Sequence, residues 1–167
     1  MSAASDAFDE LRSRGWTLGI AESLTGGSVA AELVGAPGVS AVFLGGVISY
    51  ATPVKHTVLG VDDALLSEHG PVHPQVALQM ADGVRSVVAV DGCRADVGLS
   101  TTGIAGPDSP DGQPVGTVHI GVVTPLAQKT EAFLFHGTRA QIRAQTVQAA
   151  MSLLCDAIRE CPDADES

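Results

Sequence analysis

The side chains best suited to chemistry lie early in the chain, in a turn that holds Ser23. The stretch Ile20–Ser28 places hydroxyls, a carboxylate and paired glycines between an apolar run and residues typical of a helix. A turn from strand to helix can direct a side-chain oxygen outward and present backbone N–H groups to an anion or an oxyanion. The same composition is also typical of a plain helix N-cap, because Ser and Thr cap helices routinely.

Lysine and tyrosine are both scarce, which makes Lys55 and Tyr50 notable. The chain has seven Arg but only two Lys, and Tyr50 is its only tyrosine. Arg does not release its proton, whereas a Lys that is removed from water can act as a base. We therefore interpret Ser23 as a nucleophile, Lys55 as the base that takes its proton, and Tyr50 as a group that orients or relays. The alternative is an ordinary solvated lysine at this position.

Two more turns rich in glycine and hydroxyl groups follow apolar runs, at residues 45–55 and 100–107. The pair Gly45-Gly46 indicates a bulge, or a close approach of the backbone to a ligand. The segment Thr102–Gly106 fits a ligand-binding turn, or a strand-to-loop transition without a ligand. If the strands are parallel neighbours, the three turns converge on one crevice at their carboxyl ends, where ligands gather in open α/β sheets. Backbone N–H groups of residues 25–27 or 103–106 would stabilise an oxyanion there.

Arg139 and Arg143 lie one helical turn apart at the start of the last expected helix. This spacing puts both guanidinium groups on one helix face, which suits them to grip a phosphate or a carboxylate. We expect both to bind substrate.

Metal and cofactor sites are not indicated by the spacing of the possible ligands. The three Cys form no metal-binding spacing, and Gly70-Pro71 keeps His69 and His73 from sharing a helix face. The chain has no Walker-type lysine motif and no GxGxxG motif. We therefore expect neither a metal ion nor a cofactor.

Composition indicates one cytoplasmic domain. The 167 residues are 45% hydrophobic and 17% charged, which suits a compact α/β protein. A net charge of −10 without a Lys/Arg cluster argues against nucleic-acid binding. No segment resembles a secretion signal, and no apolar run approaches the roughly 20 residues needed to cross a membrane. Sparse cysteines fit reduced thiols in a cytoplasm.

Periodicity and turn signals predict a three-layer α/β/α sandwich with a mixed, mostly parallel sheet. The domain spans residues 1–167, with a core of about 5–160 and a frayed acidic tail at 161–167. Thr138 and Gln141 form a capping-box pattern that opens the last helix. The other expected elements are helices at 5–14, 29–34, 52–59, 63–69 and 73–90, and strands at 17–21, 39–51, 95–101, 115–123 and 130–136.

Five segments, in order, resemble the C-terminal domain of the competence/damage-inducible protein CinA, which also occurs alone as a nicotinamide-nucleotide amidase. They span about residues 16–155, and the chain departs from the family pattern at Thr52, at 71–73 and at 108–112. The matching segments are Ala21-Glu22-Ser23-Leu24-Thr25-Gly26-Gly27, Phe43–Tyr50 with Lys55, Thr102–Pro107, Pro114–Val118, and Phe135–Arg139 with Ile142-Arg143.

The resemblance implies hydrolysis of nicotinamide mononucleotide to nicotinic acid mononucleotide and ammonia, by a serine amidase mechanism without metal. Ser23, Lys55 and Tyr50 match the family's catalytic serine, lysine and tyrosine. A homodimer is also expected. The alternative is a non-catalytic module of the family that binds a nucleotide or a partner. The residues expected to contact the substrate are Glu22, Thr25, Gly26, Gly27, Gly46, Thr102, Gly103, Gly106, Arg139 and Arg143.

Overall fold

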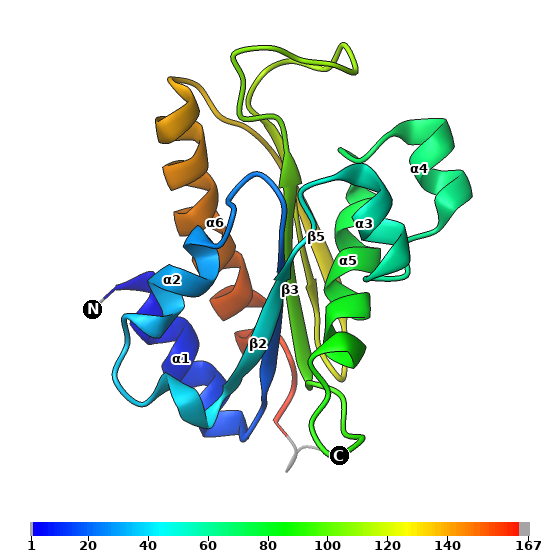
Figure 1. The fold of residues 1–167 in the computed structure, drawn as a ribbon. Coiled ribbons are helices and arrows are strands. Elements are labelled where there is room, and N and C mark those ends of the chain that lie inside the picture. The colour runs from blue at the N-terminus through cyan, green and yellow to red at the C-terminus, as the bar shows by residue number, and fades with distance from the viewer. Residues whose placement is uncertain (1, 164–167) are drawn as a thin grey trace.

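A five-stranded mixed sheet forms the middle layer of the molecule (Figure 1). The computed structural model describes residues 2–163. The strand order is β2-β1-β3-β4-β5, with β1 parallel to β2 and to β3, and with antiparallel pairs β3–β4 and β4–β5. The strands are β1 (Leu18–Glu22), β2 (Phe43–Ile48), β3 (Val97–Gly103), β4 (Thr117–Val123) and β5 (Gln128–Leu134).

The expected mixed, mostly parallel sheet is confirmed. Two of the four pairings are parallel and two are antiparallel, and β4 is the one strand of the five that runs opposite to the others. The reason is connectivity: no helix separates β3, β4 and β5 along the chain, and strands joined by loops alone pair antiparallel.

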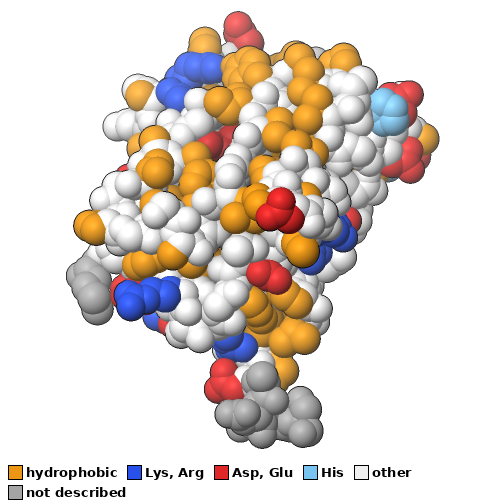
Figure 2. Space-filling view, turned by 60° about the horizontal axis from the view of Figure 1, so that its bottom comes forward, with side chains coloured by type: hydrophobic (Ala, Val, Ile, Leu, Met, Phe, Trp, Pro, Cys, Tyr) orange, Lys and Arg blue, Asp and Glu red, His pale blue; other side chains and the backbone are white. Residues whose placement is uncertain are grey.

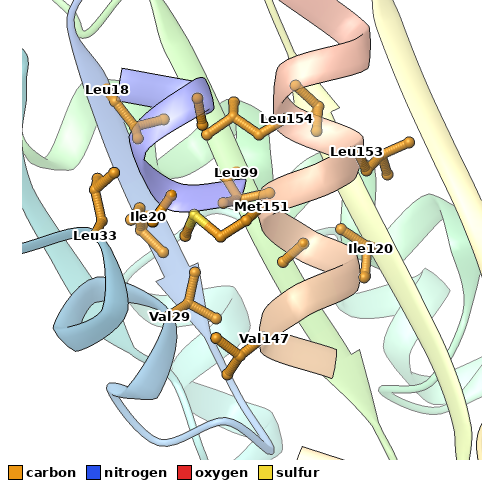
Figure 3. Packing of buried hydrophobic residues seen from close by; sticks show 14 of the residues in the cluster. Leu18, Ile20, Val29, Leu33, Leu99, Ile120, Val147, Met151, Leu153 and Leu154 are labelled. Carbon is orange, nitrogen blue, oxygen red and sulfur yellow. The ribbon is translucent and has the colours of Figure 1, made fainter. Parts of the chain in front are cut away.

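Helices cover both faces of the sheet, which gives the predicted three layers (Figure 1). One face carries α1 (Ala3–Arg14), α2 (Ser28–Val34) and α6 (Arg139–Arg159), and the other carries α3 (Thr52–Thr57), α4 (Asp63–His69) and α5 (Pro74–Val87). Figure 3 shows Met151 and Leu154 of α6 over Ile20 and Leu99 of the sheet. Burial of these side chains stabilises the fold by about 1.5–3 kcal/mol each.

Segment 39–51 differs from the single strand that was expected. Gly38 has a left-handed backbone (φ 85°) and begins a 3₁₀ turn, η1 (Val39–Ala41), so the strand starts only at Phe43. The pairing register then shifts between Leu18 and Gly19, opposite Phe43 and Gly45. The glycine pair therefore marks a bulge, which is one of the two expected explanations.

The C-terminal part of the chain shows one confirmed and one corrected expectation. The Thr138–Gln141 capping box is present at the start of α6. Ordered contacts continue past residue 160, because Cys161 is buried and Arg14 donates hydrogen bonds to the carbonyls of Cys161 and Pro162. The remaining part of the expected frayed tail, 164–167, lies outside the described residues. Within residues 2–163, no helix is both long enough and apolar enough to span a membrane.

Candidate active site

A serine and a buried lysine meet where β1 and β2 end. Lys55, on α3, is 1% exposed, and its Nζ donates hydrogen bonds to Ser23 Oγ at 3.0 Å and to the Ser49 carbonyl at 2.6 Å. Ser23 follows β1 directly, and its N–H donates to the Thr101 carbonyl of β3 at 3.1 Å. Three neighbouring strands therefore fix the relative positions of the two side chains.

Burial lowers the pKa of Lys55 from its ordinary value of 10.5 to about 8. The physical cause is desolvation, which disfavours the charged form of an amine. Among residues 2–163, no carboxylate forms an ion pair with Lys55 that would counter this effect. A pKa of about 8 leaves about a tenth of the amine neutral at pH 7, and the neutral amine can accept the Ser23 proton.

A cavity of about 400 Å³ opens onto this pair. The predicted convergence of the three turns is confirmed, because Ser23, Lys55 and the segment 102–106 line the same cavity. A long loop between β3 and β4 rises beyond the end of the sheet and adds part of the wall (Figure 1). The lining residues are Ser23, Leu24, Tyr50, Thr52, Lys55, Pro71, Val72, Thr102, Gly103, Ile104, Ala105, Gly106, Asp108, Pro110, Asp111 and Arg139.

Tyr50 contacts Arg139 rather than the serine–lysine pair. The Tyr50 hydroxyl accepts a hydrogen bond from Arg139 Nη2 at 2.9 Å, and Arg139 Nη1 donates to the Gly106 carbonyl at 2.6 Å. Tyr50 is 59% exposed at the rim of the cavity. Within residues 2–163 it has no hydrogen bond to Ser23 or Lys55, so its place fits orientation of Arg139 and of a ligand better than proton relay.

Glu22 and Gly27 have structural roles at the start of α2 and do not line the cavity. The N-cap residue is Gly27, which has a left-handed backbone (φ 102°) and no side chain to cap the helix. Glu22 is buried and supplies the missing acceptor: its Oε1 accepts from the Val29 N–H at 2.8 Å and its Oε2 from the Ala30 N–H at 3.3 Å. The helix is therefore capped by a carboxylate from the preceding strand, not by Ser or Thr as the sequence suggested.

Thr25, Gly26 and Gly46 also lie outside the cavity lining. The Thr25 hydroxyl is fully buried and hydrogen-bonds to the Thr101 hydroxyl at 2.8 Å, which ties the turn to β3. Gly26 has a left-handed backbone (φ 59°) within the turn. The Cβ of any side chain at Gly46 would lie 2.7 Å from the carbonyl oxygen of Ile20, so the pairing of β1 with β2 explains the glycine without a ligand.

Arg143 does not join Arg139 at the cavity, although both lie at the start of α6. Its Nε donates to the Leu24 carbonyl at 3.0 Å, and its Nη2 donates to the Thr25 carbonyl at 3.1 Å and to Ser28 Oγ at 3.3 Å. Arg143 thus holds the turn without bordering the cavity. The spacing predicted that both arginines would bind substrate, but of the two only Arg139 lines the cavity.

The connector between α4 and α5 forms a cavity wall that we did not predict. Pro71 and Val72 line the cavity, where the Pro71 carbonyl accepts from the Thr102 hydroxyl at 2.7 Å and the Val72 carbonyl accepts from Gln113 Nε2 at 3.0 Å. The Gly-Pro pair marked this segment as a turn, and the departure from the family pattern at 71–73 was its other sequence signal. Apart from Arg139, the other lining residues outside the three predicted turns are Asp108, Pro110 and Asp111.

Metal-binding groups do not assemble in the part of the chain that the structure describes. No set of three or more His, Cys, Asp or Glu side chains could hold a metal ion there. His69 and His73 stack with ring centroids 4.5 Å apart, but His73 lies outside α4 and caps α5 by accepting from the Gln75 N–H.

The surface in Figure 2 bears on the argument from charge in the sequence. On the face that it presents, Lys and Arg side chains lie only in small separate groups.

Known proteins match the chain over almost its whole length. A family model described as the CinA C-terminal domain matches residues 1–158. The chain belongs to the CinA C-terminal domain family. A CinA-like protein from Frankia casuarinae is 43% identical over 152 residues, which cover 91% of this chain and 34% of that protein. A putative competence-damage inducible protein from Bacillus pumilus is 38% identical, over 95% of this chain and 37% of that protein. This CinA-family chain therefore spans about a third of the length of the curated relatives it matches.

Solved structures of CinA-family proteins share the fold. A CinA superfamily protein from Klebsiella pneumoniae superposes with a TM-score of 0.88 at 29% identity, covering 95% of this chain and 97% of that one. The competence/damage inducible protein CihA from Agrobacterium tumefaciens gives a TM-score of 0.85 at 32% identity, covering 95% and 94% of the two chains. The resemblance seen in the sequence is confirmed at the level of family and fold.

The lowered pKa of Lys55 predicts a pH-dependent stability. Below about pH 8 the amine is charged in both the folded and unfolded states, and folding carries the full cost of burying that charge. Above pH 10.5 the amine is neutral in both states and the cost is gone. The free energy of unfolding should therefore rise between about pH 8 and 10.5 relative to the variant Lys55→Met, as measured by urea denaturation. A constant difference between the two proteins across this range would contradict the lowered pKa.

Proposed function

We propose that this CinA-family domain is an amidohydrolase that converts nicotinamide mononucleotide to nicotinic acid mononucleotide and ammonia. The observation that carries the proposal is the 3.0 Å contact between the buried Lys55 amine and the Ser23 hydroxyl at the wall of the cavity. A nucleophilic hydroxyl with an adjacent base is the arrangement that covalent amide hydrolysis requires. The resemblance to nicotinamide-nucleotide amidases supplies the substrate.

The first half-reaction forms an ester on Ser23. Neutral Lys55 takes the Ser23 proton as Oγ bonds to the carboxamide carbon, which produces a tetrahedral oxyanion. Leu24 borders the cavity beside Ser23, and among residues 2–163 its N–H donates to no protein group, so we assign the stabilisation of that oxyanion to this N–H. Protonated Lys55 then gives its proton to the amide nitrogen, the C–N bond breaks, and ammonia leaves.

The second half-reaction releases the acid product. Lys55, again neutral, takes a proton from a water molecule as the water oxygen attacks the ester carbon. The C–Oγ bond breaks, and Lys55 returns the proton to Ser23 Oγ. The products are a carboxylic acid and the starting enzyme, so one water molecule is consumed and no redox partner is needed.

The cavity supports a substrate of mononucleotide size. Its volume of about 400 Å³ lies within the roughly 300–1,000 Å³ that is usual for small-molecule sites. Arg139 is the lining cation other than Lys55, and its guanidinium is oriented by Tyr50 and the Gly106 carbonyl. We assign the substrate phosphate to Arg139, because guanidinium groups bind phosphate through paired hydrogen bonds.

Replacing the nucleophile tests the proposed activity directly. The wild-type protein should release ammonia from nicotinamide mononucleotide without added metal, and Ser23→Ala should lower kcat by at least about 10³-fold, because the covalent step is lost. The measurement is coupled ammonia detection together with chromatography of the nucleotide product. Ser13→Ala is a matched control on the exposed face of α1, outside the cavity lining, and should retain activity. Turnover by Ser23→Ala equal to that of the wild type would refute the role of Ser23.

The pH dependence of turnover tests the role of Lys55. Because the base must be neutral, kcat/KM should rise with pH through about 8 and level off above it. Lys55→Arg keeps a positive charge that is not released, so it should lose activity across the whole range. A kcat/KM that is flat from about pH 6 to 10, or an active Lys55→Arg, would rule out Lys55 as the base.

The same assays separate an enzyme from a binding module. The names of the relatives refer to competence and damage induction and state no reaction. Calorimetric binding of nicotinamide mononucleotide without any ammonia release would favour the non-catalytic alternative. Retention of Ser23 and Lys55 in hydrogen-bond contact favours the enzyme.

A further inference from the structure

The turn that carries Ser23 is held from inside by Glu22. This residue is 2% exposed, and its two carboxylate oxygens accept the N–H groups of Val29 and Ala30 in the first turn of α2. The helix-capping position itself is Gly27, which has no side chain to do this. The Glu22 side chain therefore joins the end of β1 to the first turn of α2, and the turn that carries Ser23 lies between these two points in the sequence.

The backbone of Glu22 also leads to the base. Its carbonyl accepts the Ser49 N–H at 2.8 Å, and the Ser49 carbonyl in turn accepts a hydrogen bond from Lys55 Nζ. Glu22 is thus one peptide bond from the nucleophile and one hydrogen bond from the residue that holds the base. A shift of Glu22 would move both groups.

The same turn is held from outside by Arg143. Its guanidinium donates hydrogen bonds to the carbonyls of Leu24 and Thr25, and Arg143 itself does not border the cavity. Arg143 therefore fixes the backbone on either side of the peptide bond between Leu24 and Thr25, while the Leu24 N–H donates to no protein group among the residues that the structure describes. Neither Glu22 nor Arg143 borders the cavity, so neither can touch a substrate bound there.

We propose that Glu22 and Arg143 are positioning residues that clamp the turn 23–28, so that Ser23 Oγ stays within hydrogen-bond reach of Lys55. The inference rests on the proposed hydrolysis and adds two residues that act through Ser23. Their role differs from that of Arg139, which borders the cavity. A displacement of about 1 Å at a reacting atom can lower a rate by about 10²-fold.

The test compares Glu22→Gln with Glu32→Gln. Both changes replace a carboxylate of the same region by an amide, but Glu32 is exposed on α2. In Glu22→Gln, the new amide would direct an N–H₂ group toward the backbone donors of α2, so the turn should shift. We expect Glu22→Gln to lower kcat about 10–100-fold with KM within about threefold, and Glu32→Gln to behave as the wild type.

Arg143→Lys is the second variant, and Arg139→Gln is the contrast. Lysine keeps the charge of Arg143 but not its forked set of donors, so kcat should again fall while KM stays near the wild-type value. Arg139→Gln should instead raise KM, because it removes a group that contacts substrate. If Glu22→Gln fails to fold, Arg143→Lys tests the clamp alone.

Covalent labelling of Ser23 provides a readout that does not depend on the substrate. A small fluorophosphonate should label Ser23 of the wild type. At a temperature well below the melting temperature of each variant, the second-order rate constant of labelling should be about 10–100-fold lower in Glu22→Gln and Arg143→Lys than in the wild type. The clamp is refuted if the two variants have lower melting temperatures but unchanged labelling and kcat, or a raised KM with unchanged kcat.

If the wild type is labelled but does not hydrolyse the nucleotide, the proposed function fails while the labelling rates still decide the clamp. If the wild type is not labelled, both proposals fail.

Discussion

The exclusion of water from the Lys55 amine is the constraint on which the site depends. Lys55 is among the largest fully buried side chains, and its hydrogen-bond partners, Ser23 Oγ and the Ser49 carbonyl, are uncharged. A charged amine in such surroundings loses its hydration and gains no countercharge, so its pKa falls to about 8. The fold accepts this cost in stability at neutral pH. In return it holds a base beside a hydroxyl, as strongly shifted groups at functional sites commonly do.

The parallel half of the sheet explains why this constraint can be met. β2, β1 and β3 are neighbours whose carboxyl ends lie at one edge, and each is followed by a turn that contributes to the cavity. The Ser23 N–H bonds to β3, and the Ser49 N–H bonds to the last residue of β1. The antiparallel β4 and β5 widen the sheet on the far side without contributing to the cavity lining.

Much of the site could be predicted because its chemistry depends on rare residue types placed next to strands. Ser23 and Lys55 were found from a hydroxyl-rich turn and a scarce lysine, and the fold brings the two side chains into contact. Side chains that act on the backbone were misassigned. Glu22 and Arg143 carry charged groups of the kind that bind ligands. Only the three-dimensional structure shows that Glu22 accepts from N–H groups of α2 and that Arg143 donates to carbonyls of the turn 23–28. The cavity wall at 71–72 was not predicted because Pro and Val side chains have no groups that bind or react. The strand expected at 39–51 was too long because residues 39–41 form a 3₁₀ turn.

Titration of the Lys55 amine by NMR tests the central claim most directly. The chain contains only two lysines, so protein labelled with ¹³C-lysine gives two side-chain signals, and Lys129→Arg assigns them. The account predicts that the Lys55 signal titrates near pH 8, and that the same signal shifts its midpoint when Ser23 is replaced by Ala. A Lys55 signal that titrates near 10.5, as in a lysine exposed to water, would contradict the claim that this amine is a buried base.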